Sequence, residues 1–153
     1  MSDLEWGVST WHLLHYIAEK ISDEFYINNK NEIINMVKTI CYNLPCPDCA
    51  GHAKYYLNSL NSNLFVNKEE FKKVLYNFHN TVNKSLSKPL FHYSKLKIYK
   101  KYNLGIILNN FSLFYGKRYG NSLQLSLQSN QLTRRNIVKQ VNLWFKLNMK
   151  EFI

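Results

Sequence analysis

Apolar residues recur every three or four positions along residues 11–86 of this 153-residue chain. This spacing places them on one face of an α-helix, whereas a half-buried strand would alternate apolar and polar residues. The first such face carries Trp11, Leu14, His15, Ala18 and Ile21. The second carries Ile33, Val37, Ile40 or Cys41, and Leu44. The pattern predicts an all-α fold that begins with two amphipathic helices.

Two more helices are expected before residue 90. Pro47 suits the first position of a helix and Asp48 its positive first turn, so a third helix should begin in the stretch "LPCPDCAGH". Asn67 with Glu70 three residues later resembles a capping box, which predicts the start of a fourth helix that Lys88-Pro89 ends. The inner face of this fourth helix should carry Phe71, Val74, Leu75, Phe78, His79, Val82 and Leu86.

The remainder of the chain gives weaker signals. Ser94 is expected to cap a short fifth helix, and four helices with short connections predict a four-helix bundle that this fifth helix closes at one end. Residues 104–120 are ambiguous between helix and strand, and a last helix is expected from about Arg134. We therefore predict one domain over residues 1–102 and a C-terminal extension over 103–153.

Positive charge is concentrated in the second part of the chain, which has a formal net charge of +10 overall. Residues 1–66 hold four Lys or Arg and seven Asp or Glu, whereas residues 67–153 hold sixteen and three. The basic residues are scattered, which favours a solubilising surface over nucleic-acid binding. No apolar run approaches the roughly 20 residues of a membrane span, and no signal peptide is visible, so we expect a soluble intracellular protein.

The three cysteines cluster within nine residues, as Cys41, Cys46 and Cys49. Such a cluster favours redox or metal chemistry over a secreted disulfide framework. Zinc is one reading, with Cys46, Cys49 and His52 as ligands and His79 or Cys41 as the fourth. A redox dithiol is the other, because Cys-x-x-Cys at a helix start exposes its first sulfur and stabilises a thiolate. Spacing alone leaves both open.

Several polar and aromatic side chains could surround this pair. Trp11 and His15 share one helical face, and His79 and Asn83 share another, with Asn80 one step round. Together they could form a slot for a flat ring system with polar edges. Lys84 and Lys88 lie four residues apart and could meet a pyrophosphate. Taken singly, each has an ordinary structural explanation as a core residue or a solvated helix face.

Three segments of the chain resemble the FAD-dependent sulfhydryl oxidases of the Erv/ALR family, and most closely their viral members from large cytoplasmic DNA viruses. These segments are "WGVSTWHLLHYIAEK", "LPCPDCAGHAKYYL" and "FHNTVNKSLSKPL", which occur in this order over about residues 6–102. The resemblance implies a helical bundle that binds FAD beside the dithiol, commonly as a homodimer. It also implies electron transfer from thiols to O2, which yields H2O2.

The resemblance gives roles to single residues. Cys46 corresponds to the outer, substrate-exchanging sulfur and Cys49 to the inner sulfur beside the flavin. Trp11 and His15 correspond to cofactor contacts of the first helix, and His52 borders the site. The contacts from the fourth helix and its end are His79, Asn80, Val82, Asn83, Lys84 and Lys88. No metal is implied.

The chain also departs from the cellular members of the family. Val8 stands where they often have Arg, and Cys41 has no family role, which suggests a buried and inert thiol. No second Cys-x-x-Cys is present, so thiol-containing substrate proteins or a separate dithiol shuttle protein must reach Cys46. The resemblance places the protein in the host cytoplasm, with a viral factory or virion as further sites. Two rivals are a zinc-stabilised interaction module with a basic binding surface, and a virion structural protein that keeps an unused oxidase fold.

Overall fold

The computed structural model describes residues 5–119 and 125–152, with side chains described from residue 130 onward in the second range. The helices are α1 (Glu5–Lys20), α2 (Asp23–Tyr42), α3 (Pro47–Asn58), α4 (Lys68–Ser85), α5 (Leu104–Tyr115) and α6 (Leu125–Leu147). Short 3-10 helices are η1 (Ser62–Phe65), η2 (Tyr93–Lys101) and η3 (Met149–Glu151). Neither described range contains a β-strand, and the predicted all-α class is confirmed.

Local sequence signals account for where α2, α3 and α4 begin. The hydroxyl of Ser22 accepts a hydrogen bond from the backbone N–H of Phe25 at 3.1 Å and caps α2. Cys46 caps α3, and Pro47 follows at its first position as predicted. The side chain of Asn67 accepts from the backbone N–H of Glu70 at 2.9 Å, which confirms the predicted start of α4.

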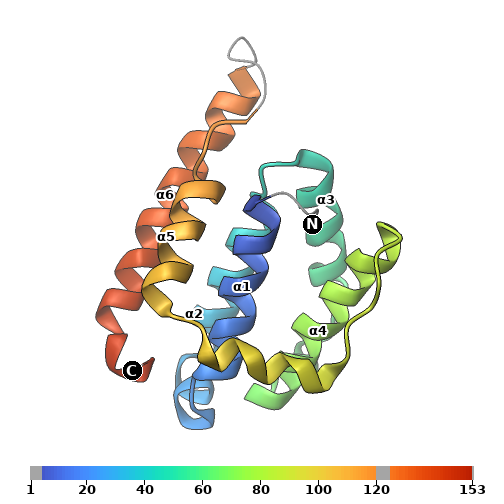
Figure 1. Cartoon of the computed structure of the whole chain (residues 1–153), viewed down its shortest axis with the longest axis vertical. Helices are drawn as coiled ribbons and strands as arrows, with labels where there is room; N and C mark the ends of the chain where they lie inside the picture. The colour runs from blue at the N-terminus through green and yellow to red at the C-terminus, as the bar shows by residue number, and fades with distance from the viewer. Residues whose placement is uncertain (1–4, 120–124, 153) are drawn as a thin grey trace.

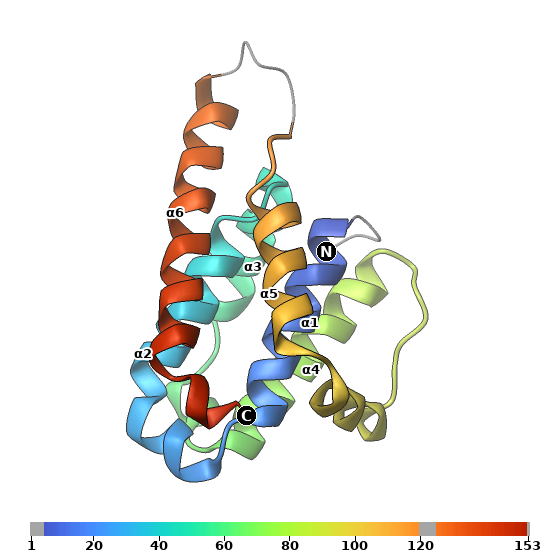
Figure 2. The same ribbon diagram turned by 60° about the vertical axis from the view of Figure 1, so that its left-hand side comes forward.

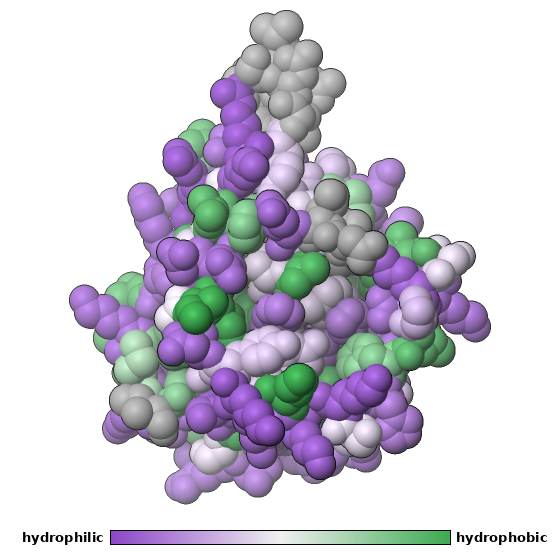
Figure 3. Space-filling model, viewed as in Figure 1, coloured by the Kyte–Doolittle hydropathy of each residue, from purple (hydrophilic) through white to green (hydrophobic). Residues whose placement is uncertain are grey.

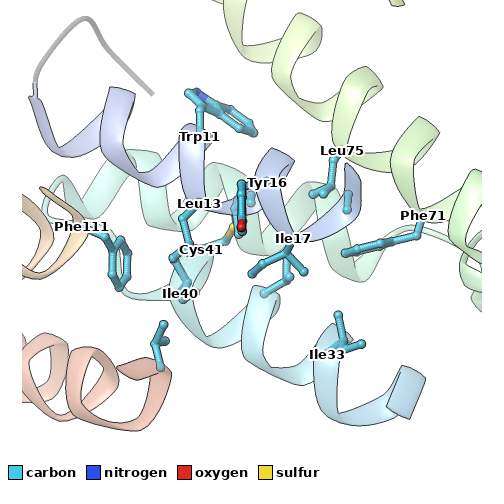
Figure 4. Close-up of a cluster of buried hydrophobic side chains, with 14 of the residues drawn as sticks. Trp11, Leu13, Tyr16, Ile17, Ile33, Ile40, Cys41, Phe71, Leu75 and Phe111 are labelled. Atoms are coloured by element: carbon cyan, nitrogen blue, oxygen red, sulfur yellow. The ribbon is translucent and has the colours of Figure 1, made fainter. Parts of the chain in front are cut away.

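Helix α1 lies at the centre of the molecule, as Figures 1 and 2 show from two directions. It packs against α4, α5 and η2, while α2 packs against α3, α4 and α6. Figure 4 shows how the core forms between these helices: Leu13 and Ile17 point from α1 toward α2. Phe71 of α4 and Phe111 of α5 enter this core from its two sides. Burial of these apolar faces is the main driving force for the bundle.

The last third of the chain joins the same core. Ile107, Phe111 and Tyr115 of α5 are buried in one cluster with residues of α1 and α2, as are Ile137, Val141, Trp144 and Phe145 of α6. The hydroxyl of Tyr115 donates to the backbone carbonyl of Ile40 at 2.8 Å, which fixes the end of α5 against α2. The proposed division at residue 103 therefore separates two parts that share a continuous interior.

The structure decides one open assignment in this region and corrects one expectation. The ambiguous stretch is helical over Leu104–Tyr115, and the side chain of Asn103 caps it by accepting from the backbone N–H of Ile106. The last helix begins at Leu125 rather than near Arg134. Its first part extends beyond the end of α5 (Figures 1 and 2), and the sequence there alternates Leu with polar residues instead of following helical spacing.

Two smaller expectations are also corrected. His92, not Ser94, caps the fifth helical segment, because its Nδ1 accepts from the backbone N–H of Ser94 at 3.2 Å. That segment is a 3-10 helix. Leu86 follows the last residue of α4 and is 45% exposed instead of lying on the inner face. Among the described residues, no helix is both long and apolar enough to cross a membrane.

Candidate functional site

Cys46 and Cys49 are joined by a disulfide at the amino end of α3, with their Cα atoms 5.2 Å apart. The Sγ of Cys46 accepts a hydrogen bond from the backbone N–H of Cys49 at 3.2 Å. Cys46 thus occupies the capping position, where unpaired N–H groups and the helix dipole favour negative charge. Both cysteines are half-buried. This position favours the thiolate that would form when the disulfide is reduced.

A groove of about 470 Å³ lies beside Cys49, between α3 and α4. Its volume is in the range of small-molecule binding sites. Apolar and aromatic side chains predominate in its wall, with Leu44, Ala53 and Phe78 among them. Three of the predicted site residues also line it: Cys49, His52 and Val82. Cys49 therefore borders a largely apolar groove.

An aromatic cluster adjoins this groove through Phe78. The ring of Trp11 stacks on His79 with centroids 3.9 Å apart and an interplanar angle of 10°. Figure 4 shows Trp11 on the other side of α1 from Leu13 and Ile17. Phe78 meets Trp11 edge-on at 5.2 Å and stacks on Tyr56 at 5.1 Å, so one ring belongs to both the cluster and the groove. Flat, aligned aromatic faces of this kind suit contact with another planar ring system.

Two imidazoles meet inside this cluster. The Nε2 of His15 and the Nδ1 of His79 are 2.9 Å apart, at hydrogen-bonding distance. Burial lowers the pKa of His15 well below its usual value, and the nearby His79 lowers it further. Burial also lowers the pKa of His79, to about 3. Both rings are therefore neutral at pH 7, and one donates its N–H to the other.

The remaining predicted contacts follow the end of α4. The amide of Asn80 donates to the carbonyl of Phe91 at 3.0 Å and accepts from the N–H of Phe91 at 3.1 Å. The backbone carbonyl of Asn83 accepts from the N–H of Lys88 at 2.8 Å. The chain turns sharply here, because Ser87 has a positive φ of 57°. Asn80 and Asn83 thus fold the segment after α4 back along the helix.

The spacing of four residues between Lys84 and Lys88 would place them one turn apart on a single helix. The structure does not place them so. Lys84 is exposed in the last turn of α4, whereas Lys88 is half-buried beyond the end of the helix. The expectation failed because α4 ends at Ser85, before the Lys88-Pro89 signal. Both lysines still lie near the carboxyl end of the helix that carries His79 and Val82. Their roles stay predictions.

The zinc reading finds no support in this arrangement. Within residues 5–119 and 125–152, no three His, Cys, Asp or Glu side chains converge as metal ligands do. The sulfurs of Cys46 and Cys49 are bonded to each other. Cys41 is buried and unpaired, and burial raises the pKa of its thiol to about 12, in keeping with the expected inert residue.

Sequence reasoning missed several residues that shape the site. Ala53 follows Cys49 by one helical turn, so the i, i+4 spacing could have placed it in the groove wall. Tyr99 stacks on His15 at 4.8 Å, and Phe91 meets His79 edge-on at 4.8 Å. Neither has a helical spacing to its partner, since both come from segments that fold back onto the bundle. No local signal could have found them.

Comparison with known proteins gives the chain its family. The Erv1/Alr family profile matches residues 8–103. An African swine fever virus protein described as "FAD-linked sulfhydryl oxidase" is 38% identical over 117 residues, which are 74% of this chain and 91% of that protein. The rice protein "FAD-linked sulfhydryl oxidase ERV1" is 37% identical over 87 residues, or 57% of this chain and 44% of the relative. No solved structure gives a significant match. The chain belongs to the Erv1/Alr family.

Proposed function

We propose that this protein is an FAD-dependent thiol oxidase that forms disulfides in substrate proteins through Cys46 and Cys49. The family membership and the names of the relatives support the FAD-linked sulfhydryl oxidase activity. One structural observation carries the assignment of the cysteines. Cys49 belongs at once to the disulfide at the start of α3 and to the wall of the groove, so a dithiol and a cofactor slot share one residue.

The residues around the groove fit a flavin. Its wall is mostly apolar, as a planar tricyclic ring requires, and the stacked Trp11 and His79 offer aromatic faces next to it. We expect FAD to be held by Trp11, His15, Cys49, His52, His79, Asn80, Val82, Asn83, Lys84 and Lys88. When bound there, FAD would accept two electrons from the reduced cysteine pair and pass them to O2, which becomes H2O2.

The chemistry of the chain itself is thiol–disulfide exchange. A substrate thiolate attacks the Sγ of Cys46, the Cys46–Cys49 bond breaks, and Cys49 leaves as a thiolate. A second substrate thiolate then attacks the substrate sulfur bound to Cys46. This step releases the oxidised substrate and leaves Cys46 as a thiolate as well. The helix start stabilises the negative charge on Cys46, which makes it a good leaving group.

The test is a visible spectrum combined with a thiol oxidation assay. The purified protein should be yellow, and it should consume O2 when dithiothreitol is added. Cys46→Ser and Cys49→Ser should each reduce this rate by at least about 100-fold, because removing either sulfur removes the disulfide. Cys41→Ser is the matched control and should keep the rate and the colour. A colourless protein, or cysteine variants that match the wild-type rate, would refute the proposal.

The remaining family expectations can be tested on the same sample. We propose a homodimer and O2 as the electron acceptor on the basis of the family resemblance alone. Light scattering coupled to size exclusion should give twice the monomer mass of 18.2 kDa. Peroxide should form in a one-to-one ratio to the disulfide produced. The location in the host cytoplasm, viral factory or virion stays a prediction as well.

A further inference from the structure

A basic groove lies between the end of α5 and the middle of α6, and the proposed thiol chemistry makes no use of it. It has a volume of about 560 Å³. Its defining residues are Leu113, Lys117, Arg118, Arg135, Val138 and Lys139. Figure 3 shows hydrophilic side chains over this part of the molecule with hydrophobic ones between them. All of these residues lie in the extension that follows the family match.

The positive charge of the basic groove is not balanced by nearby acids. Its four cationic side chains are exposed, and none forms an ion pair with a carboxylate of the described residues. Residues 103–153 contain one acidic residue, Glu151, against seven Lys or Arg. Four like charges around a concave surface attract an oppositely charged partner and raise its association rate.

The apolar side chains that line the basic groove indicate which kind of anion fits. Leu113 is 57% exposed there, and Val138 is half-buried. Proteins that hold single-stranded nucleic acid stack the bases on aromatic rings, and the described lining of this groove contains none. A lining of aliphatic and cationic side chains instead suits a peptide segment that carries both acidic and aliphatic side chains.

The basic groove and the disulfide lie at the same end of the bundle. The hydrogen bond from Tyr115 to Ile40 joins the end of α5 to the end of α2. Six residues then lead from Ile40 to Cys46, a distance of at most about 20 Å even when fully extended. Figures 1 and 2 both place the end of α5 and the start of α3 toward this end. One bound protein can therefore reach both sites.

We propose that the basic groove docks an acidic, aliphatic segment of the thiol protein that Cys46 oxidises. This inference rests on the proposed function and adds the class of substrate to it. Docking raises the local concentration of the substrate thiols at Cys46, in the way that two linked binding sites increase avidity. A small thiol such as dithiothreitol makes no use of the groove.

The experiment compares two synthetic peptides on the full-length, FAD-loaded protein. Each carries a Cys-x-x-Cys dithiol and a flexible spacer of about 10 residues, enough to bridge the expected distance. The spacer ends in a run of Asp, Glu and Leu in one peptide and of Asn, Gln and Leu in the other. The variants Lys117→Glu/Arg118→Glu and Arg135→Glu/Lys139→Glu reverse the groove charge, and Lys146→Glu/Lys150→Glu makes the same change outside it.

We expect the wild-type protein to oxidise the acidic peptide with a kcat/KM about tenfold above that of the neutral peptide, and salt should remove the difference. Either groove variant should lose the preference, whereas Lys146→Glu/Lys150→Glu should keep it. The dithiothreitol rate should be unchanged in all three variants.

Equal kcat/KM values for the two peptides would overturn the docking proposal while leaving the oxidase intact. So would an equal loss of preference in the control variant. Tight binding of a labelled single-stranded oligonucleotide that the groove variants abolish, without any peptide preference, would show a nucleic-acid site instead. A protein that fails to oxidise dithiothreitol would refute the proposed function itself, and the two failures are thus distinguishable.

Discussion

His15 and His79 form a hydrogen-bonded pair of buried imidazoles, and this pair ties the stability of the bundle to pH. In the unfolded chain both rings would take up a proton near pH 6.5. In the folded protein burial lowers the pKa of both, to about 3 for His79. Below pH 6.5 the unfolded state therefore binds more protons than the folded state. The free energy of unfolding must fall as the pH decreases through this window.

Below pH 6.5 the expected slope is at most about 1.4 kcal/mol per pH unit for each histidine, and for His79 it continues down to about pH 3. Above pH 7 the slope is zero. Urea unfolding of the purified protein at pH 7.5, 6 and 5 measures it. The double variant His15→Gln/His79→Gln should show a flatter dependence, whereas the exposed His92→Gln should match the wild type. An identical slope in all three proteins would contradict the role given to the pair.

At the scale of helices, Arg134 of α6 secures the end of α5. Its side chain is 2% exposed, and its Nε and Nη2 donate to the carbonyls of Tyr115 at 2.8 Å and Lys117 at 3.0 Å. The carbonyl of Tyr115 belongs to the last turn of α5, where the helix dipole leaves partial negative charge, and that of Lys117 lies two residues beyond it. A buried cation is thus stabilised by carbonyl oxygens and by the ring of Tyr119, with its guanidinium 6.0 Å from the ring centroid.

Replacing Arg134 with Met should destabilise the protein by about 2 to 4 kcal/mol, because the buried carbonyl of Tyr115 and the carbonyl of Lys117 lose a charged donor. Thermal or urea unfolding measures this change. The exposed neighbour Arg135 is the matched control, and Arg135→Met should alter the free energy of unfolding by less than about 0.5 kcal/mol. Equal effects of the two substitutions would show that Arg134 does not secure α5.

At the scale of the whole molecule, the C-terminal extension completes the core around the oxidase segment. Phe145 is fully buried in one cluster with residues of α1 and α2, and Phe152 is buried beside it. The hydroxyl of Tyr16 on α1 donates to the carbonyl of Phe152 at 3.4 Å. Helices α5 and α6 therefore cover an apolar face of the bundle that would otherwise meet water.

Phe145→Ala should lower the free energy of unfolding by about 3 to 5 kcal/mol, the usual cost of emptying a large buried site. Leu147→Ala, at a position that is 72% exposed, should have an effect below about 0.5 kcal/mol.

A fragment that ends at Tyr102 should be less stable than the full chain by urea unfolding. If the fragment unfolds at the same urea concentration, the extension contributes nothing to the core.

Much of the fold was predictable because its signals are local. Helical spacing placed Leu14 and Val37 on buried faces, and the Asn67–Glu70 spacing fixed the start of α4. Pro47 and Asp48 likewise marked the start of α3 beneath the cysteine pair. The reach of such signals ends with the helix, so they fix neither the start of α6 at Leu125 nor the end of α4 at Ser85, before Lys88-Pro89.

The sequence by itself determined the first four helices, a cysteine pair at a helix start and the family resemblance, since spacing, capping and motif are properties of neighbouring residues. Only the tertiary structure decided which rings meet. His15 and His79 are separated by 64 positions, and Phe91 and Tyr99 reach them from segments without helical spacing to either. Packing across the bundle is a long-range property, and it also placed the basic groove of α5 and α6 at the same end as Cys46.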